Sequence, residues 1–133
     1  MTNASTSTPI ALITGGSRGL GRNAAMHVAR SGIDVILTYR SQAAEAQAVV
    51  AEIEALGRRA VALPLDVADS RSFAAFAQQL KAALAAHRQR ERFDYLVNNA
   101  GIGIHAGFLE TTEAQFDELM AIHLQGPFFL SQQ

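Results

Sequence analysis

Short runs of apolar and β-branched residues alternate along this chain with longer segments of helical periodicity. Such alternation predicts a parallel sheet covered by helices on both faces, because each helix carries the chain back to start the next parallel strand. The expected strands are residues 10–14, 33–39, 60–65 and 95–98, and the expected helices are residues 19–31, 43–56, a segment capped by Asp69, and 112–131.

Right-handed crossovers limit how these strands can be arranged. The first three build outward to one side, and the fourth then lies on the other side of the first, in the order 3-2-1-4. This Rossmann-like, doubly wound order leaves a crevice at the carboxyl ends of the first and fourth strands, where open α/β sheets bind their ligands. Two glycine-rich loops, residues 15–21 and 98–103, follow those two strands. The sequence therefore predicts one ligand crevice between the two loops.

The length and composition suit one domain, since 133 residues with 49% hydrophobic content can form a core. We expect residues 1–8 to form a flexible tail and residues 9–133 to form the domain. The net charge of −1 gives no indication of a nucleic-acid or membrane partner. The chain has no cysteine and no close spacing of histidines with acids, so we predict no metal site. No signal peptide or apolar run of about 18 residues is found, and we expect a cytoplasmic protein.

The turn Thr14–Gly21 (TGGSRGLG) joins the first strand to the first helix. Its glycines serve either a tight turn or the close approach of a phosphate to the helix N-terminus. Two common phosphate-binding patterns are excluded. A P-loop needs Lys and Ser or Thr where this chain has Arg22 and Asn23, and the glycine spacing is GxxxGxG instead of GxGxxG.

Three motifs together are similar to those of the short-chain dehydrogenase/reductase family. Thr14–Gly21 resembles its TGxxxGxG motif, Asn98–Gly101 resembles its NNAG motif, and Asp66–Val67 resembles the Asp-Val pair after the third strand. The resemblance spans residues 9–133 and corresponds to the amino-terminal half of a family member. It implies a nicotinamide-dependent oxidoreductase whose Rossmann-type domain is truncated in this chain.

The resemblance also implies a cofactor site. The three spaced glycines would line the pyrophosphate and the Asp-Val pair would contact the adenine. Asn98, Ala100 and Gly101 would contact the ribose and stabilise the sheet. The implied cofactor-binding residues are Thr14, Gly15, Ser17, Arg18, Gly19, Leu20, Gly21, Tyr39, Arg40, Ser41, Asp66, Val67, Asn98, Ala100 and Gly101.

The residues after the second strand bear on which nicotinamide cofactor is bound. An acid at this place would bind the ribose 2′-hydroxyl of NAD, whereas an arginine accommodates the 2′-phosphate of NADP. The chain has Arg40 there and Arg18 in the glycine turn. Guanidinium groups form strong hydrogen bonds with phosphate, so we predict NADP(H) over NAD(H). The alternative is that both are solvated surface arginines.

In the family, the chemistry belongs to a Ser and a Tyr-x-x-x-Lys. Tyr39 and Tyr95 are the only tyrosines, and Lys81 is the only lysine. Neither tyrosine has a lysine four residues after it. We therefore expect the catalytic half to lie outside these residues and the chain alone to be inactive. His123 occupies the position of the family's relay Asn, and it serves either as a catalytic relay residue or as a packed histidine bonded to backbone.

Three functions remain open at this point. The first is an oxidoreductase that transfers hydride between nicotinamide and a small carbonyl or alcohol substrate. The second is a non-catalytic dinucleotide-binding module, and the third is a fragment without a ligand. The fourth strand would form an apolar sheet edge, and the last helix packs between subunits in the family, so we expect a homo-oligomer.

Overall fold

The protein is described by a computed structural model that covers residues 8–133, apart from the side chains at positions 87 and 88. The tail expected at residues 1–8 therefore lies outside the described residues except for Thr8. The strands are β1 (Ile10–Ile13), β2 (Asp34–Tyr39), β3 (Ala60–Pro64) and β4 (Tyr95–Val97). The helices are α2 (Gly19–Arg30), α3 (Ala43–Ala55), α4 (Phe73–Arg88), α5 (Glu113–Met120) and α6 (Gly126–Gln132), with short 3₁₀ turns η1 (Ser70–Ser72) and η2 (Phe108–Glu110).

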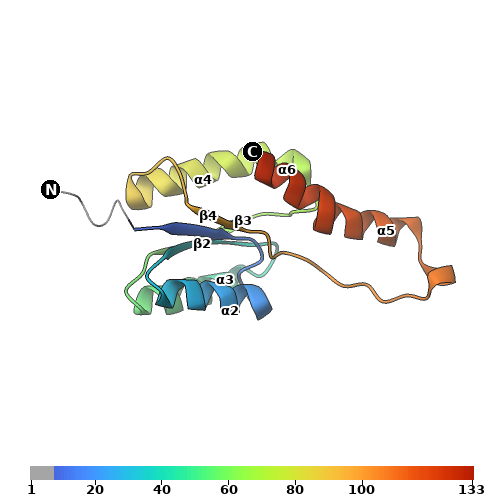
Figure 1. Cartoon of the computed structure of the whole chain (residues 1–133), viewed down its shortest axis with the longest axis horizontal. Helices are drawn as coiled ribbons and strands as arrows, with labels where there is room; N and C mark the ends of the chain where they lie inside the picture. Colours follow the sequence, from blue (N-terminus) through green and yellow to red (C-terminus); the bar gives the residue numbers. More distant parts are fainter. Residues whose placement is uncertain (1–7) are drawn as a thin grey trace.

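The four strands form one parallel sheet in the order β3-β2-β1-β4, which confirms the predicted topology. β1 pairs with β2 on one side, with Ile10 opposite Asp34, and with β4 on the other, with Ile13 opposite Val97. Figure 1 shows α2 and α3 on one face of the sheet and α4 and α6 on the other. The molecule is thus doubly wound.

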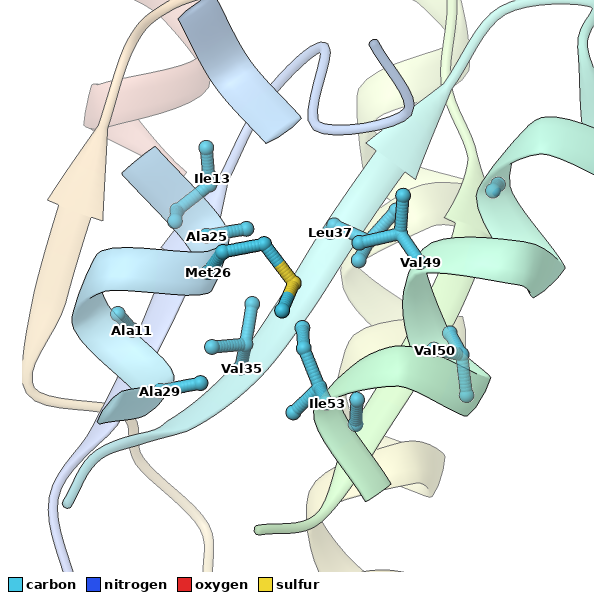
Figure 2. Close-up of a cluster of buried hydrophobic side chains, with 12 residues drawn as sticks. Ala11, Ile13, Ala25, Met26, Ala29, Val35, Leu37, Val49, Val50 and Ile53 are labelled. Atoms are coloured by element: carbon cyan, nitrogen blue, oxygen red, sulfur yellow. The ribbon is translucent and has the colours of Figure 1, made fainter. Parts of the chain in front are cut away.

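The core between the sheet and helices α2 and α3 is built from small and branched side chains (Figure 2). Ala25 and Ala29 bring α2 close to the sheet, and Met26 fills the space beside Val35 and Leu37. Leu20 takes no part in this core, since it is 82% exposed. This residue lies in the first turn of α2, beyond the end of the strand that the rest of the helix covers.

The core on the opposite face includes an apolar stripe along α4. Phe73, Phe76 and Leu84 are buried against strand residues that include Leu12 and Ile36. Asp69 also caps as expected, although it caps the turn η1, where its side chain accepts from the Arg71 N–H.

The helix predicted for residues 112–131 is confirmed in its extent, because α5, η3 (Ala121–Gln125) and α6 follow one another without a break, but η3 is a π-helical turn that was not predicted. Pro127 supplies a physical reason. In a continuous α-helix it would have no N–H for the carbonyl of His123, and its ring would clash with that carbonyl. Gly126 also packs against the Val67 carbonyl so closely that a Cβ would overlap it. The wider π turn meets both constraints.

Several large apolar side chains are exposed along β4 and the last two helices. Tyr95 on the edge strand is 53% exposed, and Phe116, Leu124 and Phe128 are each more than half exposed. Figure 1 shows the segment after β4 running away from the sheet before α5 returns toward it. β4 is therefore an open edge beside an apolar helical surface.

Candidate functional site

A cavity of about 640 Å³ lies where the carboxyl ends of the strands meet the two glycine-rich loops. All the predicted cofactor-site residues line it except Thr14 and Asn98. Segments that are far apart in the sequence therefore meet at the predicted switch point. The lining residues that sequence analysis did not predict are Thr38, Gln42, Leu65, Asn99, Ile102 and Ile122.

The N-terminus of α2 opens onto this cavity. Its N-cap, Arg18, has an extended backbone and makes no side-chain cap, and no acidic residue lies in the first turn. The first backbone bond of the helix runs from the Arg22 N–H to the Arg18 carbonyl. The N–H groups of residues 19–21 consequently have no acceptor within the helix. With the positive end of the helix dipole, they form a site for an anion.

The three spaced glycines of the turn meet different steric demands. Gly15 has φ +66°, and a Cβ there would lie 2.9 Å from the Ala100 Cα. A Cβ at Gly21 would overlap the Gly15 carbonyl and the Asn99 side chain. Gly19 has φ +59°, but a Cβ there would have no heavy atom within 4 Å. Gly15 and Gly21 thus allow the two loops to pack together, while Gly19 leaves the cavity open.

Thr14 and Asn99 tie the two loops together. The buried Thr14 Oγ1 accepts from the N–H groups of Asn99 and Ala100, both at 3.0 Å. The Asn99 side-chain amide donates to the carbonyls of Thr14 and Gly15, both at 3.1 Å. These bonds fix the relative positions of the two loops that form the crevice.

Asn98 lies away from the cavity. Its side-chain amide donates to the Ser131 Oγ at 3.3 Å, toward α6. Thr14 and Asn98 bond to neighbouring elements and do not line the cavity, and their contact with the cofactor stays a prediction.

Thr38 supports the glycine turn from β2. Its Oγ1 accepts from the Gly15 N–H at 3.2 Å, and its carbonyl accepts from the Gly16 N–H at 3.0 Å. Nothing local in the sequence identifies Thr38, because its partners lie more than 20 residues away. Asn99 and Ile122, in contrast, adjoin predicted site residues and could have been included.

Positive charge dominates the part of the cavity between the glycine turn and the end of β2. Arg18 and Arg40 are both exposed at its wall, and within residues 8–133 neither forms a salt bridge with a carboxylate. The neighbouring Arg22 differs, since it pairs with Glu52 at 2.6 Å. Asp66 is the one acid among the described lining residues, and its Oδ1 accepts from the Ala68 N–H at 3.0 Å. This wall therefore favours an anionic ligand.

The described part of the chain offers neither a metal-binding cluster nor a membrane-spanning helix. No group of three or more His, Cys, Asp or Glu side chains there could hold a metal ion. No described helix is both long enough and apolar enough to cross a membrane.

Comparison with known proteins decides the family. A family model described as short chain dehydrogenase matches residues 9–133. This chain belongs to the short-chain dehydrogenase family. The three motifs that suggested the resemblance all lie within the matched region.

Among curated dehydrogenases of this family, the chain is 36% identical over 121 residues to the L-rhamnose 1-dehydrogenase (NAD(P)(+)) of Sphingomonas sp. strain SKA58. It is 31% identical over 123 residues to the tetrahydroxynaphthalene reductase PfmaG of Pestalotiopsis fici. These alignments cover 91% and 92% of the chain but 45% and 42% of the relatives. The chain thus spans less than half the length of these two relatives.

Solved structures show the same relationship. A short-chain dehydrogenase from Burkholderia cenocepacia J2315, in complex with NADP, is 39% identical and superposes with a TM-score of 0.83. The superposition covers 93% of this chain and 48% of the other. The Rossmann-like fold is therefore shared with a dehydrogenase whose structure contains NADP.

Proposed function

We propose that this chain binds NADP(H) in the cavity and forms the cofactor-binding part of an oxidoreductase. The bound cofactor would donate or accept the hydride exchanged with a carbonyl or alcohol. The observation that carries the proposal is the uncapped N-terminus of α2, which opens onto the cavity between Arg18 and Arg40. That arrangement combines an anion site with cationic side chains, and both suit a phosphorylated dinucleotide.

The lining residues can be assigned to parts of the dinucleotide. The N–H groups at the start of α2 would bind the pyrophosphate, beside the open face of Gly19. Asp66 and Val67 would contact the adenine, and Ala100 and Gly101 would contact the ribose nearer the nicotinamide. Ser17 and Leu20 complete the wall beside the phosphates.

The 2′-phosphate would bind at the end of β2, between Arg18 and the segment Tyr39–Ser41. The Burkholderia structure with NADP supports this choice, while the rhamnose enzyme's name includes both NAD and NADP. No acid follows β2 to bind a free 2′-hydroxyl. NADP(H) is therefore proposed over NAD(H).

Substitution of the arginines tests this preference. The wild type is expected to bind NADPH about tenfold or more tightly than NADH, and Arg40→Ala or Arg18→Ala should each reduce that ratio about five- to tenfold, since each removes a charge-assisted bond. Arg71→Ala is the matched control, because Arg71 is exposed and lies outside the cavity. Tighter binding of NADH than of NADPH by the wild type would contradict the proposal.

Catalysis by these residues alone is not proposed. Neither tyrosine begins a Tyr-x-x-x-Lys sequence, so the chain lacks the family's acid-base pair, and His123 is its one candidate for the proton relay. We expect saturable NADPH binding without consumption of NADPH over a panel of aldehydes and ketones. Turnover with any of them would show that other residues supply the proton.

The second candidate is a non-catalytic dinucleotide-binding module. An NADPH-dependent rise in melting temperature without turnover in the natural full-length protein would support the module over the oxidoreductase. The substrate is left open, because the two relatives named above act on chemically different compounds according to their names.

The partners and location stay proposals as well. The exposed apolar surface along α5 and α6 supports self-association into a homo-oligomer. A cytoplasmic location is proposed from the sequence composition alone.

A further inference from the structure

Thr38, the penultimate residue of β2, is buried and lines the cavity. Its Oγ1 accepts a hydrogen bond from the Gly15 N–H at 3.2 Å, and its carbonyl accepts one from the Gly16 N–H at 3.0 Å. A Cβ added to Gly16 would lie 2.7 Å from the Leu37 Cβ. The first two glycines of the turn are therefore held against the last residues of β2.

Gly15 is bonded from two sides of the sheet. Thr38 accepts from its N–H, and the Asn99 side-chain amide donates to its carbonyl at 3.1 Å. The loop that carries Asn99 is bonded in turn to a further element, since the His123 Nε2 lies 2.7 Å from the Ile102 carbonyl oxygen. Gly15 has φ +66°, but glycine adopts many other conformations as readily. Its two hydrogen bonds are what select this one.

The side chain of Thr38 supplies a bond that the backbone of β2 does not. The bond from the Gly16 N–H ends on a backbone carbonyl, which every residue has at this position. The bond from the Gly15 N–H ends on the hydroxyl, which valine lacks although it has the same branched shape. With valine at this position, the Gly15 N–H would lose its acceptor, and the turn would gain free energy by moving until that N–H meets water.

The position of Thr38 also connects two parts of the proposed site. The turn that it holds leads to the N-terminus of α2, where the pyrophosphate is proposed to bind. The residues that follow it, Tyr39–Ser41, form the proposed 2′-phosphate site. A ligand that carries phosphates on both the 2′ and the 5′ oxygen of one ribose needs these two places at one fixed separation.

We infer that the Thr38 hydroxyl is a positioning group that keeps the glycine turn in register with the end of β2, so that the 2′-phosphate and the 5′-phosphate bind together. The inference rests on the proposed function, because that function places the two phosphates. Thr38 acts through the Gly15 N–H and needs no contact with the ligand.

Three variants separate the hydroxyl from the shape of the side chain. Thr38→Val keeps the branched shape without the hydroxyl, Thr38→Ser keeps the hydroxyl without the methyl group, and Thr38→Ala lacks both. Thr111→Val is the matched control, because it also removes one hydrogen bond between a threonine hydroxyl and the backbone, to the Gly107 carbonyl, outside the cavity. Amide hydrogen exchange at Gly15 and the dissociation constants of adenosine 2′,5′-bisphosphate and adenosine 2′-monophosphate are measured for each.

In Thr38→Val and Thr38→Ala, exchange at Gly15 and the dissociation constant of the bisphosphate should each rise about three- to tenfold, the effect of one lost hydrogen bond. The dissociation constant of the 2′-monophosphate should stay unchanged, because this nucleotide has no phosphate to place at the turn. Thr38→Ser and Thr111→Val should match the wild type in all three measurements.

The inference is overturned if Thr38→Val leaves the exchange at Gly15 or the binding of the bisphosphate unchanged. Equal weakening of both nucleotides would also overturn it, since that is the result of a general loss of structure, and so would a Thr38→Ser variant as impaired as Thr38→Val. If the wild type binds neither nucleotide, the proposed function fails, and the exchange at Gly15 alone decides whether the hydroxyl holds the turn.

Discussion

Gly21 shows how one residue without a side chain determines the distance between two loops. It lies in the first turn of α2, where an ordinary glycine lowers helix stability by up to about 1 kcal/mol relative to alanine. Here, however, a Cβ would overlap the Gly15 carbonyl and the Asn99 amide. The steric term outweighs the helix propensity, because both neighbours are held by hydrogen bonds.

Gly21→Ala is therefore expected to destabilise the protein by about 2 kcal/mol, the cost of forcing a methyl group into a packed site. Helix propensity alone predicts that Gly21→Ala stabilises the protein. Urea unfolding measures the difference. Gly103→Ala is the control, since nothing lies within 4 Å of a Cβ at Gly103, and it should change the free energy of unfolding by less than about 0.5 kcal/mol. A stabilised Gly21→Ala would refute the steric argument.

Asp94 joins β1 to the segment before β4 at the other end of the sheet. It accepts from Arg90 at 3.0 Å and from the Ile10 N–H at 2.8 Å. The Arg90 guanidinium, and next the Ile10 N–H, hold the pKa of the Asp94 carboxyl below its usual range. A depressed folded-state pKa stabilises the protein above the unfolded value of about 4, and that stabilisation is lost as the pH falls through the folded value.

The wild type should accordingly be more stable than Asp94→Asn at pH 7, by about 1 kcal/mol or less because the side chain is more than one-third exposed. Urea unfolding at pH 7, 5 and 3 should show this difference shrinking at pH 3. Arg90→Gln should weaken the same pH dependence. A difference that stays constant or grows in acid would contradict the account.

The order of the strands and the placement of the helices follow from the alternation of strand-like and helix-like segments in the sequence and from the right-handedness of the crossovers. The departures from prediction have specific causes. The π turn after α5 depends on Pro127 and on the contact between Gly126 and the Val67 carbonyl. Pro127 is visible in the sequence, but the contact joins residues almost 60 positions apart. Local periodicity could not predict a π turn that this contact helps to determine.

The residues of the site also divide into those predicted from the sequence and those whose placement depends on tertiary contacts. Most of the lining residues of the glycine turn, Tyr39–Ser41 and Asp66–Val67 were predicted, because the glycine turn follows β1 at the switch point and the family resemblance implied the others. The roles of Thr14 and Asn98 were not, because the direction of their side chains depends on tertiary partners such as Asn99 and Ser131.

The C-terminus of α4 offers a test at this scale. Gln89 ends the helix with φ 53°, in the left-handed region that costs a residue with a Cβ about 1–2 kcal/mol. Gln89→Gly should stabilise the protein by about 0.5–1 kcal/mol, less than the full relief because glycine also loosens the unfolded chain. Thermal melting measures this. Gln89→Ala keeps the Cβ and should have the same melting temperature as the wild type. An unchanged melting temperature for Gln89→Gly would refute the claim that Gln89 is strained.

For the whole molecule, the exposed apolar surface on α5 and α6 is the main unpartnered feature among the described residues. The proposed self-association through it predicts a sedimenting mass at least twice the chain mass of 14.2 kDa. Phe116→Glu combined with Leu124→Glu should shift the mass to that of one chain, because charges would be buried without partners. Leu56→Glu, at the end of α3 on the other layer, should leave it unchanged. A wild type that sediments as a single chain would contradict the proposal.

An equilibrium titration of the wild type with NADPH, followed by nicotinamide fluorescence, tests whether the cavity binds the dinucleotide. Saturable binding at one site per chain is expected. Adenosine 2′,5′-bisphosphate should compete at least tenfold more strongly than adenosine 5′-monophosphate, because Arg18 and Arg40 lie together at the cavity wall. Absence of saturable binding, or equal competition by the two nucleotides, would contradict the account.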